Sequence, residues 1–161
     1  MVFIIRSVQD KAVGLSAAGI RAEENKDENA RDGAAMNWLW VAMGGAIGAS
    51  LRYGIGLWLF KPQMQFPWPT WWVNILGCLC TGIFLAYSQK YPALQQEARL
   101  FLMVGLLGGF TTFSSFGLES FQLLKQGAIS MALLYMFSSL LLGLTALTVG
   151  FYLSDFMLNQ T

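Results

Sequence analysis

The sequence predicts an all-α membrane protein with four transmembrane helices. Of its 161 residues, 55% are hydrophobic and only 12% are charged, about half the charged share of roughly 25% in soluble domains. From residue 36 to the end, only eight residues carry charge, and they leave uncharged runs at 33–51, 62–89, 100–118 and 126–154. These runs are 19, 28, 19 and 29 residues long. Because about 20 apolar residues of helix cross a bilayer, each run is long enough for one span.

We expect the four spans at about 37–60, 69–88, 98–123 and 128–154, so that residues 36–161 form one four-span domain. The connections are short, and the function must therefore lie within the bilayer. Residues 1–35 are polar and hold 11 charged residues, a composition typical of disorder or of a loose helix. Met36 stands directly before the first apolar run. Our hypothesis is that natural translation begins there, which would make the preceding extension dispensable and not native.

Composition also excludes several classes of function. A net charge of +1 without a basic cluster argues against nucleic-acid binding. There is no His, and two Cys residues cannot form a zinc or iron–sulfur site. No Walker-type phosphate loop is present. Cys78 and Cys80 are two residues apart, which turns them to different helix faces, and we interpret them as small core residues without a disulfide.

The first span contains small residues and one cation. Gly44 and Gly48 share a helix face, an arrangement that lets a second helix backbone come close, and we interpret both as packing residues. Arg52 lies about five turns into the same span. A cation at that depth is costly and is either functional or extended toward the interface. The sequence leaves both interpretations open: a vestibule that attracts anions, or a snorkelling side chain.

Asn74 is a polar residue within the second span. A carboxamide at membrane depth needs partners, and it can both donate and accept hydrogen bonds. It either ties two helices together or donates to a permeating anion. Taken alone, Asn74 favours the helix tie.

The most specific motif is Gly-Gly-Phe-Thr-Thr-Phe-Ser-Ser-Phe at 108–116. Adjacent glycines weaken a helix by about 1 kcal/mol each relative to alanine, so this pair invites a break in the middle of the third span, which we expect over Gly108–Thr111. Free backbone groups at a break are tolerated in a membrane only inside protein or along a cavity, where they can coordinate ions. Phe113 and Phe116 lie three residues apart and either pack in a core or present their positive ring edges to an anion.

The charges give no clear orientation. With both termini on one side, that side holds Lys90 and Arg99, and the other holds Lys61 and Lys125. Two basic residues against two give the positive-inside rule nothing to act on. Arg21, Lys26 and Arg31 of the extension tip the count toward cytoplasmic termini.

The runs GGAIGASLRY, WWVNILGC and GGFTTFSSFGLE, in this order on four short spans, closely resemble the bacterial CrcB/Fluc family of fluoride channels. The resemblance covers essentially all of residues 37–154. It implies an antiparallel, dual-topology homodimer in the cell inner (plasma) membrane, with two fluoride pathways, a structural Na⁺ at the interface and no enzymatic activity. The even Lys/Arg count agrees with insertion in both orientations.

The resemblance also implies site residues. The family's pore asparagine falls on Asn74, its two pore phenylalanines on Phe113 and Phe116, and the polar track of the fourth span on Tyr135 and Ser139. Backbone carbonyls of Gly108 and Thr111 would hold the Na⁺, and the glutamate after the break falls on Glu119. Thr70 and Ser114 are weaker candidates along the fluoride pathway, and Arg52 would lie in the anion vestibule. Gly143 replaces a serine that some members have, which leaves the outer end of the track in question.

The implied mechanism is passive: fluoride sheds water and contacts an amide, hydroxyls and ring edges, so that a leak of the anion lowers its cytoplasmic concentration. A small multidrug exporter needs a carboxylate in the middle of the first span, where this chain has Arg52. An enzyme with Ser114 or Ser115 as nucleophile lacks an activating His, Lys or carboxylate at that depth. A sodium-coupled transporter of the same fold remains open.

Overall fold

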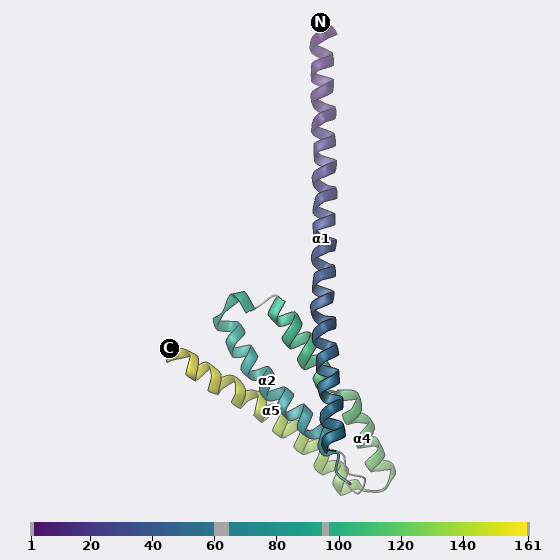
Figure 1. Cartoon of the computed structure of the whole chain (residues 1–161), viewed down its shortest axis with the longest axis vertical. Helices are drawn as coiled ribbons and strands as arrows, with labels where there is room; N and C mark the ends of the chain where they lie inside the picture. The colour runs from purple at the N-terminus through teal and green to yellow at the C-terminus, as the bar shows by residue number, and fades with distance from the viewer. Residues whose placement is uncertain (1, 60–64, 95–96, 161) are drawn as a thin grey trace. The chain divides into compact units, whose positions relative to one another are not determined.

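The computed structural model describes residues 2–59, 65–94 and 97–160, and every regular element in these ranges is helical. The elements are α1 (Val2–Leu59), α2 (Trp68–Lys90), η1 (Pro92–Leu94), η2 (Arg99–Leu107), α3 (Gly108–Phe110), α4 (Phe113–Lys125) and α5 (Ile129–Asn159), as Figure 1 shows. Four stretches are long and apolar enough to cross a membrane: Arg31–Leu59, Trp68–Lys90, Arg99–Lys125 and Ile129–Asn159. The prediction of an all-α protein with four spans is therefore confirmed.

The chain divides into two compact units, Met1–Trp38 and Leu39–Thr161. The first unit is the N-terminal part of α1, which is helical from Val2 onward. Composition had left disorder and a loose helix open for this segment, and the structure has a helix. The second unit contains every residue of the site described below. Two residues used in the sequence analysis, Phe60 and Lys61, lie outside the described residues.

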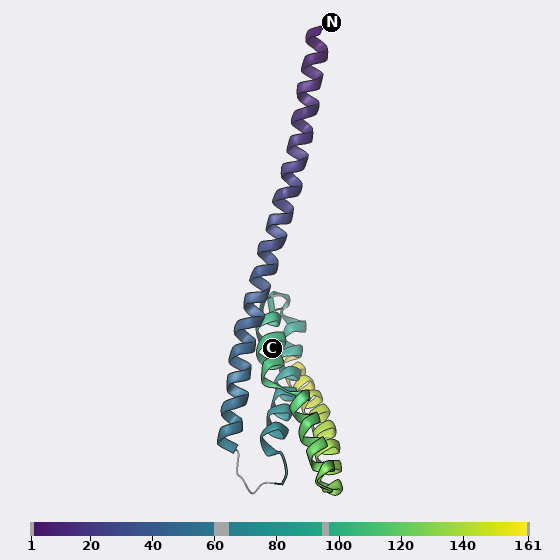
Figure 2. The ribbon, with the colours of Figure 1, turned by 90° about the vertical axis from the view of Figure 1, so that its right-hand side faces the viewer.

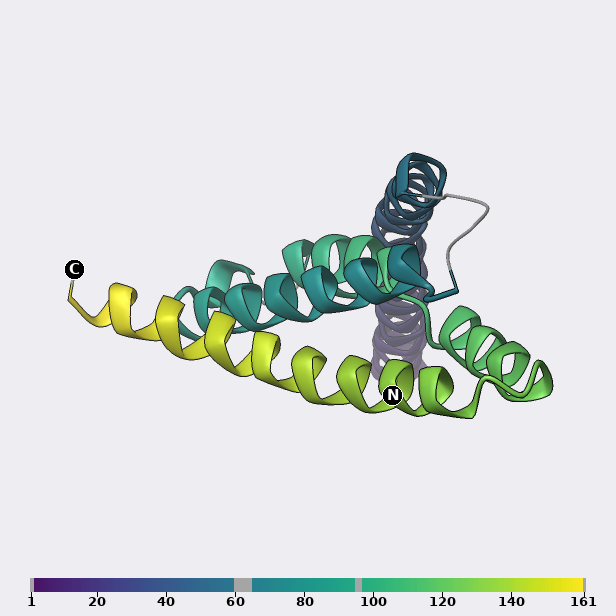
Figure 3. The same cartoon turned by 90° about the horizontal axis from the view of Figure 1, so that it is seen from below.

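α2 and α5 lie side by side along most of their length (Figures 1 and 3). Glycines allow this close contact. A Cβ on Gly82 would collide with the carbonyl oxygen of Leu147, and a Cβ on Gly150 would lie 2.5 Å from that of Leu79. The two backbones thus touch directly, which fixes the register of α2 against α5.

α1 packs in the same way on the third span (Figure 2). A Cβ on Gly44 would collide with the carbonyl oxygen of Phe101, and one on Gly48 would collide with that of Leu106. From the other side, a Cβ on Gly109 would lie 2.6 Å from the carbonyl oxygen of Gly45. Gly44 and Gly48 therefore lie where the backbones meet.

The third span differs from a regular α-helix in two ways. Its first part, η2, is a π-helix of nine residues, for which the apolar pattern gives no signal. Its backbone then leaves helical geometry at Thr111 (φ −77°, ψ 159°) and Thr112 (φ −151°, ψ 115°). Gly108 and Gly109 are helical residues of α3, so the backbone leaves helical geometry at the C-terminal end of the expected Gly108–Thr111 range and one residue beyond it. The space against α1, rather than backbone flexibility, accounts for glycine at position 109.

A small core lies where α4 and the N-terminal part of α5 meet. Tyr135 is fully buried there and contacts the ring of Phe66 edge-on, with centroids 5.4 Å apart. The Trp71 indole N–H donates to Ser138 Oγ at 3.0 Å, which ties α2 to α5. This core fixes the positions of the residues on α2, α4 and α5 that line the site.

Candidate functional site

The carboxamide of Asn74 binds the backbone at the non-helical point of the third span. Its Nδ2 donates to the carbonyl oxygen of Thr112 at 3.2 Å, and its Oδ1 accepts from the Thr112 amide at 2.8 Å. A backbone that leaves helical geometry inside a membrane needs such partners, since water cannot supply them. Asn74 is thus the helix tie that its position in the second span suggested.

The two threonines complete the local hydrogen bonding. Thr112 is the N-cap of α4, and its Oγ1 accepts from the Ser115 amide at 3.2 Å, the usual role of a threonine at this position. The Thr111 hydroxyl donates to the carbonyl oxygen of Leu107 at 2.9 Å. The N-cap of α4 therefore has partners for both its side chain and its backbone.

These bonds have a consequence for two backbone carbonyls. In a continuous α-helix, the carbonyl of Gly108 would accept from the amide of Thr112, four residues on. That amide instead donates to Asn74. Likewise, the helical partner of the Thr111 carbonyl is the Ser115 amide, which donates to Thr112 Oγ1. The two carbonyls that the resemblance assigns to a cation have thus lost their helical partners.

A cation site here would have to be built from such carbonyls. Within the described residues, no group of three or more His, Cys, Asp or Glu side chains could hold a metal ion. Backbone carbonyl oxygens are hard ligands suited to hard cations. The donor set at Gly108 and Thr111 therefore fits Na⁺ in kind.

A cavity of about 390 Å³ brings together four of the residues predicted along the fluoride pathway, Asn74, Phe113, Phe116 and Ser139, and we call it the phenylalanine cavity. Its remaining lining residues are Cys78, Thr81, Thr111, Thr112, Leu140 and Leu147. The two phenyl rings lie 5.7 Å apart and are tilted by 35°. Ser139 Oγ is inaccessible to solvent and has no hydrogen-bond partner among the described residues. The cavity thus combines an apolar wall with an unused hydroxyl.

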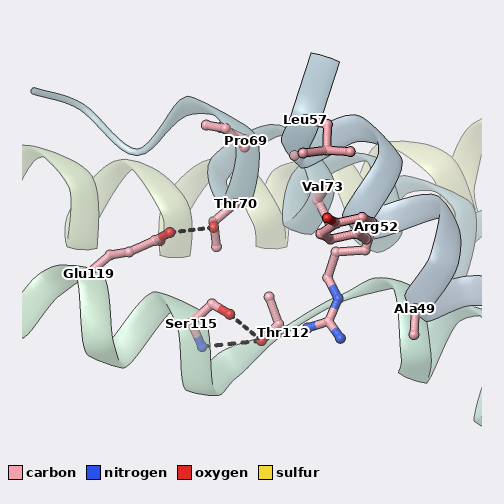
Figure 4. Close-up of a pocket in the computed structure, with 11 residues that line it drawn as sticks. Ala49, Arg52, Leu57, Pro69, Thr70, Val73, Thr112, Ser115 and Glu119 are labelled. Atoms are coloured by element: carbon pink, nitrogen blue, oxygen red, sulfur yellow. Dashed lines mark hydrogen bonds between the residues drawn. The ribbon is translucent and has the colours of Figure 1, made fainter. Parts of the chain in front are cut away.

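A second cavity, of about 420 Å³, contains Arg52, and we call it the arginine cavity (Figure 4). Its lining also includes Thr70, Thr112, Ser115 and Glu119, in addition to Ala49, Tyr53, Gly56, Leu57, Pro69 and Val73. Figure 4 shows the guanidinium of Arg52 directed toward Thr112. Since Thr112 also lines the phenylalanine cavity, the two cavities adjoin at the non-helical backbone.

Glu119 joins α2, α4 and α5 in one hydrogen-bonded group. Its Oε1 accepts from the Thr70 hydroxyl at 2.7 Å, and its Oε2 accepts from the Tyr135 hydroxyl at 2.8 Å. Thr70 is 8% exposed and Tyr135 is fully buried. The Tyr135 ring also lies 5.3 Å from that of Phe116, between centroids. Through these contacts Glu119 supports one ring of the phenylalanine cavity.

The structure distributes the predicted residues over these groups. Arg52 and Thr70 line the arginine cavity, whereas Tyr135 reaches it only through Glu119. Ser114 is exposed and lines neither cavity, although its Oγ lies 3.3 Å from Thr112 Oγ1.

Sequence reasoning missed several lining residues: Thr112, Ser115, Cys78 and Thr81. A signal existed for two of them. Cys78 and Thr81 follow Asn74 at helical spacing of four and seven residues, which places all three on one face of α2. Cys80, on another face, is exposed, so the interpretation of both cysteines as small core residues is wrong for Cys80; both are free cysteines.

Comparison with known proteins gives a consistent result. Residues 39–151 match the profile of a family described as CrcB-like protein, Camphor Resistance (CrcB). The chain is 50% identical over 117 residues to the fluoride-specific ion channel FluC of Thermus thermophilus, covering 72% of this chain and 91% of that protein. It is 48% identical over 115 residues to the protein of the same name from Chloroflexus aurantiacus, covering 71% and 91%. For that of Hyphomonas neptunium the identity is 47% over 119 residues, covering 73% and 94%.

Proposed function

Because the chain belongs to the CrcB-like family, we propose that it is a fluoride-specific channel, a multi-pass protein of the plasma membrane through which fluoride passively leaves the cytoplasm. The observation that carries this proposal is the phenylalanine cavity, where Asn74, Phe113, Phe116 and Ser139 meet. None of the four carries a fixed charge. Such a lining replaces the water of a small anion with weak donors and does not trap it.

Each wall of the phenylalanine cavity offers a different kind of contact. The Asn74 carboxamide has two N–H donors, and one of them is used for Thr112. The Ser139 hydroxyl has no hydrogen-bond partner in the part of the chain that the structure describes. The edges of Phe113 and Phe116 carry the positive part of the ring quadrupole and can face an anion weakly. Fluoride passing this point would meet donors on α2, α4 and α5.

Arg52 gives the arginine cavity its role in the proposal. The Arg52 side chain is half-buried and lines the arginine cavity together with Glu119. Both carboxylate oxygens of Glu119 already accept hydrogen bonds, one from Thr70 and one from Tyr135. The guanidinium would therefore raise the local concentration of anions at the entrance to the phenylalanine cavity. This favours the vestibule over a purely snorkelling side chain.

The working unit in this proposal is an antiparallel, dual-topology homodimer in which the third span of each subunit is broken in the middle of the membrane. Phe113 is 85% exposed in the single chain although it lines the cavity, so a second copy is needed to close the pathway around it. The extended backbone of Thr111 and Thr112 supports the break. The two-against-two Lys/Arg count supports both orientations.

We further propose that carbonyls of Gly108 and Thr111 from both subunits hold one Na⁺ at the dimer interface. The capture of their helical amide partners by Asn74 and Thr112 supports this assignment. The competing arrangement closes the break with threonine hydroxyls and needs no ion. Those hydroxyls bond to Leu107 and Ser115 and leave the two carbonyls for another partner. When bound, the cation would offset part of the cost of placing an anion near mid-membrane.

Ion efflux from proteoliposomes tests the function. Liposomes loaded with fluoride and chloride should release fluoride and retain chloride when the purified protein is present. Comparable release of both anions would contradict fluoride selectivity. Sodium movement stoichiometric with fluoride would instead indicate a sodium-coupled transporter of the same fold.

A further inference from the structure

α2 presents a polar face to the phenylalanine cavity, formed by Asn74, Cys78 and Thr81. These residues are spaced by four and three positions and so lie above one another on the helix. Asn74 is occupied in part by Thr112, and the Thr81 hydroxyl donates to the carbonyl oxygen of Gly77 at 2.8 Å. The Cys78 thiol is half-buried, and no hydrogen bond from it is found within the described residues. Its S–H is therefore an unused, weak donor in the cavity wall.

Cys78 lies opposite Gly143 of α5, a residue without a side chain. On α5, Ser139 lines the cavity, whereas Gly143, one helical turn further on, is buried and is not among the lining residues. A Cβ placed on Gly143 would lie 3.5 Å from Cys78 Sγ. The thiol thus lies over Gly143, and α2 supplies the side chain that α5 lacks at this level.

The cavity around Cys78 independently indicates a ligand. The Ser139 hydroxyl, one turn away on α5, is also buried without a partner. Buried polar groups in native proteins nearly always have hydrogen-bond partners. An unpaired O–H and an unpaired S–H in one cavity, with no carboxylate among its lining residues, suit a small anion.

Resting on the proposed function, we propose that the Cys78 thiol contacts fluoride and continues the pathway past Ser139 at the level of Gly143. The thiol is a weaker donor than a hydroxyl. It would therefore stabilise the anion without holding it, as conduction through successive sites requires. The donors of the pathway then alternate between helices: Asn74 and Cys78 from α2, and Ser139 from α5.

Substitutions at Cys78 test this assignment, with Cys80 as the matched control. Cys78→Ala should lower fluoride efflux roughly fivefold, the effect of losing one hydrogen-bond donor. Cys78→Ser should keep efflux at or above the wild-type rate, because it keeps a donor. Cys80→Ala should have no effect, since Cys80 lies outside the cavity and is exposed. Cys78→Ala efflux equal to that of the wild type would overturn the assignment.

A rescue from the other helix separates a donor from a space-filling side chain. Gly143→Ser has room, because its Cβ would be in ordinary van der Waals contact with the sulfur. In the double variant Cys78→Ala/Gly143→Ser, the new hydroxyl should restore most of the efflux, whereas Cys78→Ala/Gly143→Ala should not. Equal rescue by both would show that volume alone matters and would overturn the donor role.

Two further measurements keep this result separate from other failures. Size-exclusion profiles of all variants report assembly. If Cys78→Ala does not assemble, Cys78→Ser is the test variant. Its fluoride efflux must then match that of the wild type, and a loss of efflux would count against the proposal. Wild-type fluoride and chloride efflux, measured in the same liposomes, tests the channel function itself. If the wild type does not release fluoride, both proposals fall. If it does and Cys78→Ala conducts equally well, only the Cys78 assignment falls.

Discussion

The side chain of Asn74 forms hydrogen bonds in both directions with the backbone of Thr112, although the two residues are 38 positions apart. The pair gives the non-helical backbone of the third span the donor and acceptor that the bilayer cannot provide. It also diverts the Thr112 amide from the Gly108 carbonyl. One carboxamide thus holds the shape of the span, lines the phenylalanine cavity and leaves the Gly108 carbonyl without its helical partner.

Asn74→Leu should destabilise the protein by about 2–6 kcal/mol, because it leaves two backbone groups of Thr112 without partners at roughly 1–3 kcal/mol each. Asn74→Asp keeps the acceptor for the Thr112 amide but loses the donor. We expect it to assemble and to conduct little fluoride, since its carboxylate repels anions. Thermal unfolding in detergent and fluoride efflux measure the two effects.

Asn159 provides the control for these variants. Its carboxamide is exposed and, within the described ranges, bonds only to Asp155 of the same helix, at 3.3 Å. Asn159→Ala should leave both stability and efflux unchanged. A melting temperature for Asn74→Leu equal to that of Asn159→Ala would argue against the role of Asn74 as a tie.

Phe113→Ile and Phe116→Ile should both reduce fluoride efflux sharply, because each removes a ring edge from the phenylalanine cavity. Their effects on stability should differ. Phe113 is 85% exposed in the single chain, whereas Phe116 packs on the buried Tyr135. Thermal unfolding of the dissociated chain should therefore show a larger loss for Phe116→Ile. Undiminished efflux in either variant would assign that ring to packing alone. Phe121→Ile is the control, because Phe121 is exposed on α4 and lies outside both cavities.

Gly44→Ala and Gly48→Ala should each destabilise the fold by about 1–3 kcal/mol, the usual cost of overpacking. Their Cβ atoms would collide with the carbonyl oxygens of Phe101 and Leu106. Gly54→Ala, on the same helix, meets nothing within 4 Å. It should be neutral or slightly stabilising, since alanine favours helix over glycine by about 1 kcal/mol. Similar melting temperatures for Gly44→Ala and Gly54→Ala would contradict the close packing of α1 on η2.

The spacing of charges was enough to predict the four spans, since length and hydropathy determine what crosses a bilayer. The motif around residues 108–116 also indicated where chemistry would lie. The exact residues that leave helical geometry did not follow from composition. Glycine signals a weak helix, but the break falls at Thr111 and Thr112, where Asn74 and the Thr112 hydroxyl replace helical partners.

Long-range pairing accounts for most of what the sequence did not predict. Glu119 is 49 residues from Thr70 and 16 from Tyr135, and nothing local indicates that one carboxylate joins both. Cys78 was interpreted as a small core residue because it lies in an apolar run, and nothing local indicates that it lines the phenylalanine cavity. The π-helical turns of η2 have no counterpart in the apolar pattern.

A chain starting at Met36 should insert in both orientations, because its Lys and Arg residues divide two against two between the membrane faces. Three lysines added after Met36 should lock the termini inside and abolish fluoride efflux. Co-expression with a copy biased the opposite way should restore it. Labelling of single introduced cysteines from each side reports orientation. Full activity of a chain locked in one orientation would rule out the antiparallel dimer.

Sodium should be needed for assembly but should not move with fluoride. The proposed site consists of backbone carbonyls at Gly108 and Thr111, whose helical amide partners bond elsewhere. Without a cation, these oxygens would face one another across the interface unsatisfied, which is costly in hydrocarbon. Exchange of Na⁺ for a larger cation during purification should therefore lower both the melting temperature and fluoride efflux, and returning Na⁺ should restore them. Tracer sodium uptake in the same liposomes distinguishes a structural ion from a transported one. A protein indifferent to the exchange would favour a break closed by the hydroxyls of Thr111 and Thr112 alone.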